Sequence, residues 1–265
     1  MMVKTMNFSF FESPQLWIAT LALIFSQLPP LRDLVRGTKI CINTKEQITL
    51  TTFLGRLDAG IFLDIHNTGG KAVSIAKIDC IIQKDKDHVW NLPARTYFLG
   101  QNEFLLGGIS LKPGEHWSNS IRCYDLLEEE EEEEVYTIVS KFSAWQNRNS
   151  VNTTPTATNP FETEASAELV NSATNFFKKH FNLRRGNYQL FITALSESNK
   201  ILCVKGFSFI LFDSYIHTLQ ADTDEYKYGK GILSYSTPIY PRLHPLEDDD
   251  AQKIYQKLHH SLIGE

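Results

Sequence analysis

Two histidines near the ends of expected strands, His66 and His116, have the side chains best suited to acid–base chemistry. An imidazole changes its charge near neutral pH, so a histidine beside a carboxylate or a hydroxyl can act as a general base. The sequence identifies no partner for either side chain, and a surface or hydrogen-bonded histidine is the simpler interpretation. We therefore assign no catalytic residue, and an enzyme with an unrecognised site stays open as an alternative.

The motifs that would define a reaction class do not occur in the sequence. Gly69-Gly70 and Gly107-Gly108 fit neither GxxxxGK followed by Ser or Thr nor GxGxxG after a strand, which are the phosphate-binding patterns. The GxSxG turn of serine hydrolases is missing as well. Seven consecutive glutamates at 128–134 lack the turn-forming glycine and the ligand spacing of a calcium loop. These patterns predict no cofactor and no bound metal, and they place the glutamates in a solvated loop or at the start of a helix.

The cysteines are widely spaced along the chain, at Cys41, Cys80, Cys123 and Cys203. No CxxC pair occurs, so a zinc site is not expected. The order Cys80, Trp90, Cys123 is similar to the Cys, Trp, Cys order of antibody domains, but Ile121 stands where those domains carry a tyrosine. Buried free thiols are the prediction, and a disulfide is the alternative.

Length and composition are those of a globular protein. The 265 residues are 42% hydrophobic and 22% charged, which is enough to form a buried core and unlike a disordered chain. The net charge of −5 argues against nucleic-acid binding, because that binding needs basic residues that displace phosphate counterions. Either one large domain or two small ones would fit this length.

An apolar segment near the amino end predicts a membrane anchor. Its eighteen residues, 14–31, would reach about 27 Å as a helix, against about 30 Å for the hydrocarbon core of a bilayer. Aromatic residues precede the apolar run and arginines follow it, as at membrane boundaries. A buried core helix and an interfacial helix are the alternatives. The side chains expected to contact lipid are Leu16, Trp17, Ile18, Leu21, Leu23, Ile24 and Phe25.

Positive charge around this segment predicts its orientation. Only Lys4 precedes it, whereas Arg32, Arg36, Lys39 and Lys45 follow it. Positively charged flanks favour the cytoplasmic side, so we expect a bacterial-type inner membrane with the carboxyl-terminal domain in the cytoplasm. Reduced thiols agree with that compartment.

The rest of the chain reads as mainly β, with an immunoglobulin-like antiparallel β-sandwich as the expected fold. Short segments of alternating polarity are separated by Gly and Pro turns at intervals typical of a sandwich. The expected strands include a hairpin of 60–66 with 72–83, two weak strands broken by Pro93, and the segments 116–124, 188–196 and 201–212.

Three regions follow from this pattern. Residues 1–36 form the tail and membrane anchor, 37–246 the sandwich with an inserted acidic and helical segment at about 125–186, and 247–265 a carboxyl-terminal helix. Within the insertion we expect a strand at 135–145 and an amphipathic helix that begins at Asn159.

The predicted function is that of a non-enzymatic sensor, adaptor or accessory subunit of a membrane complex. Its partners would be the lipid bilayer and a protein. Aromatic side chains on exposed loops are the expected contacts, because binding surfaces favour them, and these are Tyr97, Phe98, Tyr226 and Tyr228. An exported, anchored adhesin-like or chaperone-like sandwich is the alternative from a different class.

Overall fold

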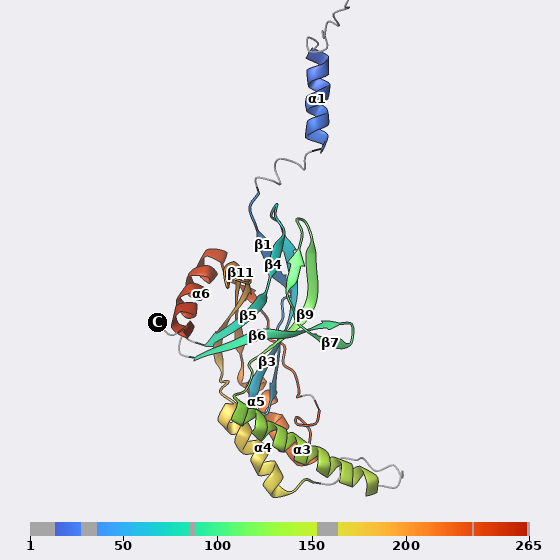
Figure 1. Cartoon of the computed structure of the whole chain (residues 1–265). Coiled ribbons are helices and arrows are strands. Elements are labelled where there is room, and N and C mark those ends of the chain that lie inside the picture. Colours follow the sequence, from blue (N-terminus) through green and yellow to red (C-terminus); the bar gives the residue numbers. More distant parts are fainter. Residues whose placement is uncertain (1–13, 28–35, 85–87, 153–163, 235, 264–265) are drawn as a thin grey trace, which may run out of the picture.

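The structure is a computed structural model that describes residues 14–27, 36–84, 88–152, 164–234 and 236–263, and it consists of a β-rich body with one helix, α1, standing apart (Figure 1). The strands are β1 (Ile40–Thr44), β2 (Thr49–Phe53), β3 (Arg56–Asn67), β4 (Val73–Ile75), β5 (Lys77–Lys84), β6 (His88–Leu99), β7 (Asn102–Leu105), β8 (Ile109–Leu111), β9 (His116–Tyr124), β10 (Gly186–Leu195), β11 (Ile201–Leu211) and β12 (His244–Pro245). The helices are α1 (Pro14–Gln27), α3 (Glu129–Asn152), α4 (Ala167–His180), α5 (Asp213–Ala221), the 3₁₀ helix η2 (Asp222–Tyr228) and α6 (Asp248–Ile263).

Within the described residues, ten strands form one antiparallel sheet in the order β1-β3-β9-β6-β5-β10-β11-β12, with β2 paired to β3 and β7 paired to β6. β4 and β8 form a separate small sheet. The large sheet curls into a half-barrel, and its two sides approach each other where β1 lies against β11.

Strand β6 joins the two sides of this sheet. Its first half, up to Pro93, pairs with β5, and its second half, from Ala94 to Phe98, pairs with β9. The register shifts between Ala94 and Thr96, which marks a bulge at Arg95. A proline has no N–H to donate and a bulge bends a strand, so this is where the sheet can turn.

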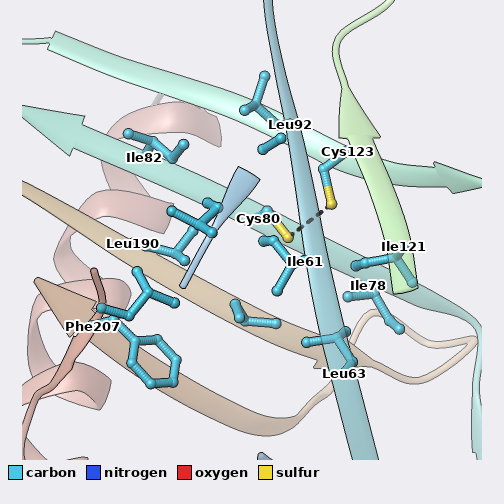
Figure 2. Close-up of a cluster of buried hydrophobic side chains, with 14 of the residues drawn as sticks. Ile61, Leu63, Ile78, Cys80, Ile82, Leu92, Ile121, Cys123, Leu190 and Phe207 are labelled. Atoms are coloured by element: carbon cyan, nitrogen blue, oxygen red, sulfur yellow. Dashed lines mark hydrogen bonds between the residues drawn. The ribbon is translucent and has the colours of Figure 1, made fainter. Parts of the chain in front are cut away.

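The core fills the inside of the curl. Alternate residues of β3, among them Ile61, Leu63 and Ile65, face inward and are almost fully buried against side chains of β5, β9 and β10 (Figure 2). The far side of β10 and β11 is covered by α6, through Ala251 and Tyr255.

A glycine allows α6 to approach the sheet closely. A Cβ atom built at Gly206 of β11 would lie only 2.6 Å from Cβ of Ala251. β11 therefore has apolar contacts on both faces, as its nearly continuous apolar sequence predicts.

A second apolar cluster closes the other end of the body, where α3 and α4 lie side by side (Figure 1). The turn between β2 and β3 enters this cluster through Leu54, which is 1% exposed. Gly55 has a φ of 85° and touches the end of α4, where a Cβ would lie 2.4 Å from the carbonyl oxygen of Phe177. Only glycine combines a positive φ with the absence of a side chain that would clash with α4.

The prediction of a mainly β antiparallel fold is confirmed, and the immunoglobulin-like sandwich is not. A sandwich has two separate sheets that face each other across a core. Here β6 forms hydrogen bonds with β5 and with β9, so the strands form one continuous sheet. The two weak strands expected around Pro93 are the two halves of this one strand.

The expected hairpin of 60–66 with 72–83 is wrong. β3 pairs with β1, β2 and β9, whereas the return segment is divided into β4, which pairs with β8, and β5, which pairs with β6 and β10. The turn after β3 contacts the start of β1 and does not begin a hairpin, because the N–H groups of Thr68 and Gly69 both donate to the carbonyl oxygen of Lys39.

The described parts of the segment 125–186 form the helices α3 and α4, and the strand expected at 135–145 is wrong because these residues lie inside α3. α3 begins in the glutamate run, at Glu129, where negative side chains suit the positive end of the helix dipole. The helix start expected at Asn159 lies outside the described residues. α4 begins at Ala167, and its N-cap is Ser166, whose side chain accepts a hydrogen bond from the N–H of Leu169.

The carboxyl-terminal helix is confirmed as α6. At the other end of the chain, α1 covers fourteen residues of the predicted anchor, and the part after Gln27 lies outside the described residues. In the part of the chain that the structure describes, no helix has both the length and the apolar content to cross a membrane. The predicted transmembrane helix is therefore without support from the structure.

Candidate binding groove

A groove of about 880 Å³ runs over the outer face of the sheet, on the side away from the core. Its floor is formed by small residues on the outward face of neighbouring strands, namely Thr49 and Thr51 of β2, Gly60 of β3 and Ser120 of β9. Because alternate residues of a strand point to opposite faces, the same strands supply both the apolar core and this polar floor.

Longer side chains make the walls of the groove. Phe98 of β6 stands on one side, and Tyr240 and Arg242 stand on the other. The segment that carries Tyr240 is held beside β2 by paired backbone hydrogen bonds between Leu50 and Ile239. Phe62 lies under the ammonium group of Lys45, whose Nζ is 4.4 Å from the ring centroid.

One end of the groove holds a group of paired charges. The guanidinium group of Arg122 on β9 donates to the carboxylate of Asp58 on β3, and its Nη1 lies 3.6 Å from Oε1 of Glu103 on β7. The hydroxyl of Thr96 on β6 donates to the same oxygen of Glu103. This group, which we call the Arg122 cluster, connects four neighbouring strands on their outer face.

Burial determines the electrostatics of this cluster. Asp58 has a side chain that is only 9% exposed, and its burial raises the pKa of the carboxyl group, while the hydrogen bond from Arg122 opposes that rise. The charged form of Asp58 is thus stabilised by Arg122, and removal of the arginine would leave a buried charge without its main partner.

The lining of the groove offers several kinds of group for contact with a ligand. It offers hydroxyl groups, aromatic faces and charged side chains, but its lining residues include neither a histidine nor a cysteine that could activate a hydroxyl. Such a surface can hold an extended segment of a partner by hydrogen bonds and aromatic contacts.

His66 and His116, the two histidines considered for catalysis in the sequence, lie together on the same outer face, beyond the groove. The rings of His66 and His116 stack with centroids 5.2 Å apart, and Nε2 of His66 lies 2.7 Å from Oδ2 of Asp64. The hydroxyl of Ser118 donates to the other oxygen of Asp64. That hydrogen bond, followed by the contact with His66, lowers the pKa of the Asp64 carboxyl.

This arrangement differs from a catalytic triad. In a triad the histidine contacts the hydroxyl and the carboxylate holds the histidine. Here the carboxylate lies between the two, so His66 cannot take the proton of Ser118 directly. Among the described residues, no three His, Cys, Asp or Glu side chains are grouped in a way that could hold a metal ion.

The residues predicted to contact a partner fall in different places. Phe98 lines the groove, while Tyr97 points to the other face and packs between Phe104 and Trp117. Both belong to strand β6, not to a loop. Tyr226 is 1% exposed in the helical cluster, which leaves Tyr228 as the residue of that pair nearer the surface. Their contact with a partner stays a prediction.

Sequence reasoning missed the Arg122 cluster and the wall of Tyr240 and Arg242. The alternation of β9 does place Arg122 on the polar face, so a search for charged residues on outward positions would have found it. Its pairing with Asp58, which is 64 positions earlier, follows only from the sheet order.

Comparison of the chain with models of protein families, with curated proteins and with solved structures gives no match. The function must therefore be inferred from the groove, the helices and the charges of this chain alone.

The Arg122 cluster makes a prediction about stability. Replacing Arg122 with glutamine should lower the free energy of unfolding at pH 7 by about 2 to 3 kcal/mol, because the buried carboxylate of Asp58 loses its partner. The loss should shrink as the pH falls through the raised pKa of Asp58, because protonation removes the unpaired charge. Urea unfolding of variant and parent at pH 7 and pH 4.5 measures both effects.

Arg185→Gln is the matched control for this prediction. Arg185 pairs with Asp213, but the two side chains are 72% and 62% exposed, so the same substitution should cost less than about 0.5 kcal/mol. Equal losses for Arg122→Gln and Arg185→Gln, or a loss for Arg122→Gln that does not shrink in acid, would contradict the role of the cluster.

Proposed function

We propose that this chain is a membrane-attached, non-enzymatic binding protein. In this proposal α1 inserts its side chains into a lipid bilayer, and the groove on the outer face of the sheet holds a segment of a protein partner. The body would act as a sensor, an adaptor or an accessory subunit of a membrane complex.

The exposed apolar surface of α1 is the observation that carries the proposal. Its large side chains are about half exposed or more, from 48% for Ile24 to 67% for Ile18. The hydroxyl of Ser26 donates to the carbonyl oxygen of Leu23 within the same helix, so this polar group needs no water. An apolar helix of this kind in water would be costly, and lipid would remove that cost.

The described part of α1 is shorter than the hydrocarbon core of a bilayer is thick. Its fourteen residues reach about 21 Å, which is less than the hydrocarbon core of about 30 Å. Insertion of the described helix into one side of a bilayer is sufficient for attachment. Trp17 near its amino end suits the boundary between headgroups and hydrocarbon.

The end of the body from which the chain leads to α1 supports the same placement. Lys39, Lys71 and Lys112 are exposed on the segments that precede β1, follow β3 and precede β9. These segments are joined by backbone hydrogen bonds, from Thr68 to Lys39 and from Asn67 to Glu115. Lysines at this end would meet anionic headgroups favourably.

The proposed orientation keeps the body in the cytoplasm. It rests on the excess of positive charge after α1, which determines the orientation when the segment 14–31 crosses the bilayer, and the proposed location is a bacterial-type inner membrane. The partner in the groove would be a protein segment with aromatic or polar side chains, because the walls offer Phe98 and Tyr240 and the floor offers hydroxyl groups.

Vesicle flotation tests the attachment. The full chain should float with phosphatidylcholine vesicles, and Leu21→Glu combined with Ile24→Glu should reduce the floating fraction by about tenfold or more, because two carboxylates would have to enter the apolar layer. Asn102→Glu combined with Asn187→Glu adds the same charge to exposed positions of the body and should float like the parent. Equal flotation of the two double variants would contradict attachment through α1.

Site-specific photocrosslinking tests the groove. A photoreactive phenylalanine analogue at Tyr240, which is 51% exposed on the groove wall, should give one discrete adduct in membranes of the producing cell. The same analogue at Tyr136 of α3, which is 73% exposed and away from the groove, is the control and should give none. Phe98→Ala should weaken the adduct, and identical adducts at Tyr240 and Tyr136 would argue against a specific groove.

A further inference from the structure

Two cysteine side chains point toward each other inside the curled sheet. The sulfur atoms of Cys80 on β5 and Cys123 on β9 are 3.1 Å apart, and both residues are 0% exposed (Figure 2). β5 and β9 do not pair with each other, since β6 lies between them in the sheet. Leu92 and Ala94 of β6 face Cys80 and Cys123 in the two registers, so the thiols meet at the bend of β6.

We infer that Cys80 and Cys123 form an intramolecular disulfide when the chain folds in the presence of a small-molecule disulfide oxidant. A disulfide has its sulfur atoms about 2.05 Å apart, so the two atoms need to approach by about 1 Å. Both side chains already point at each other (Figure 2), so the bond would join two sulfur atoms that are in contact in the reduced form. The inference does not depend on the proposed function.

The chemistry is thiol–disulfide exchange, with an oxidant such as glutathione disulfide. The thiolate of one cysteine, after loss of its proton to water, attacks the oxidant, forms a mixed disulfide and releases one small thiol. The other cysteine then attacks the protein sulfur of that mixed disulfide and releases the second small thiol. Two protein thiols are oxidised, and the oxidant takes up the two electrons and the two protons.

The burial of the pair determines when this reaction can occur. Burial is the largest cause that raises the pKa of the Cys123 thiol, so the folded body holds little of the reactive thiolate. The exchange must therefore accompany folding, before the core closes. Once the bond has formed, the same burial shields it from reductants.

The other cysteines provide an internal comparison. Cys41 and Cys203 are partly exposed, and the sulfur atom of Cys41 lies 3.9 Å from the side-chain oxygen of Asn43. The Cys41→Ser and Cys203→Ser double variant retains only the buried pair, and within the core it changes one side chain, that of Cys203, which packs against the edge of the main apolar cluster. Its oxidised and reduced forms can be compared without any substitution at Cys80 or Cys123.

The bond would also report on the compartment of the body. Structural disulfides persist in exported proteins and are rare in the cytoplasm. A bond found in cells would favour the exported alternative over the cytoplasmic orientation, while the attachment of α1 to lipid would be unaffected. Failure of this inference is thus distinguishable from failure of vesicle flotation.

The test refolds the full-length Cys41→Ser and Cys203→Ser variant from denaturant, once with reduced and oxidised glutathione together and once with a strong reductant. Each sample is then denatured, alkylated and measured by mass spectrometry. After oxidative refolding we expect no alkylation and a crosslinked peptide that contains Cys80 and Cys123. The oxidised form should melt about 10 °C above the reduced form, because the bond closes a loop of 43 positions. Alkylation of both thiols after oxidative refolding, or a bond only between two chains, would overturn the inference.

Discussion

The hydrogen bonding of β6 on both sides of its bend is the constraint on which the rest of the body depends. One twelve-residue strand pairs with β5 through its first half and with β9 and β7 through its second half. Pro93 and the bulge at Arg95 mark the changeover, where an unbroken ladder would resist bending. Through this strand, two groups of strands that are distant in sequence enclose a single core.

The bend has consequences on both faces of the sheet. On the inner face it brings Cys80 of β5 and Cys123 of β9 into contact across β6. On the outer face it places Phe98 as a wall beside the small residues of β2, β3 and β9 that form the floor of the groove. The Arg122 cluster connects β3 and β9 of this floor with β6 and β7 by charged and hydrogen-bonded side chains, which would hold the floor in place for the partner proposed above. Preorganised surfaces of this kind lose less entropy on binding.

The sequence allowed some of these features to be predicted and hid others. The alternation in β3 and the apolar runs of β10 and β11 identify strands because each strand has its own pattern of burial. The sheet order could not be predicted, because pairing depends on contacts between distant residues, as the wrong hairpin of β3 shows. The segment 135–145 of α3 alternates enough in polarity to predict a strand, although Val135, Ile138, Val139 and Phe142 also recur at helical spacing. Pro93 predicts a break between two strands, because proline interrupts most strands. That β6 instead continues through Pro93 and changes its partner from β5 to β9 cannot be seen in the local sequence.

Amide hydrogen exchange of the full chain tests most directly whether β6 unites the two sides into one folded unit. Ile82 of β5 and Ile121 of β9 lie on strands that are paired on both sides, one in each part of the sheet. The account predicts that the slowest amides of β5 and β9 open with the same free energy and the same denaturant dependence, equal to those of global unfolding. Earlier opening of the β9 amides while the β5 amides stay protected would show two separate units and contradict the account.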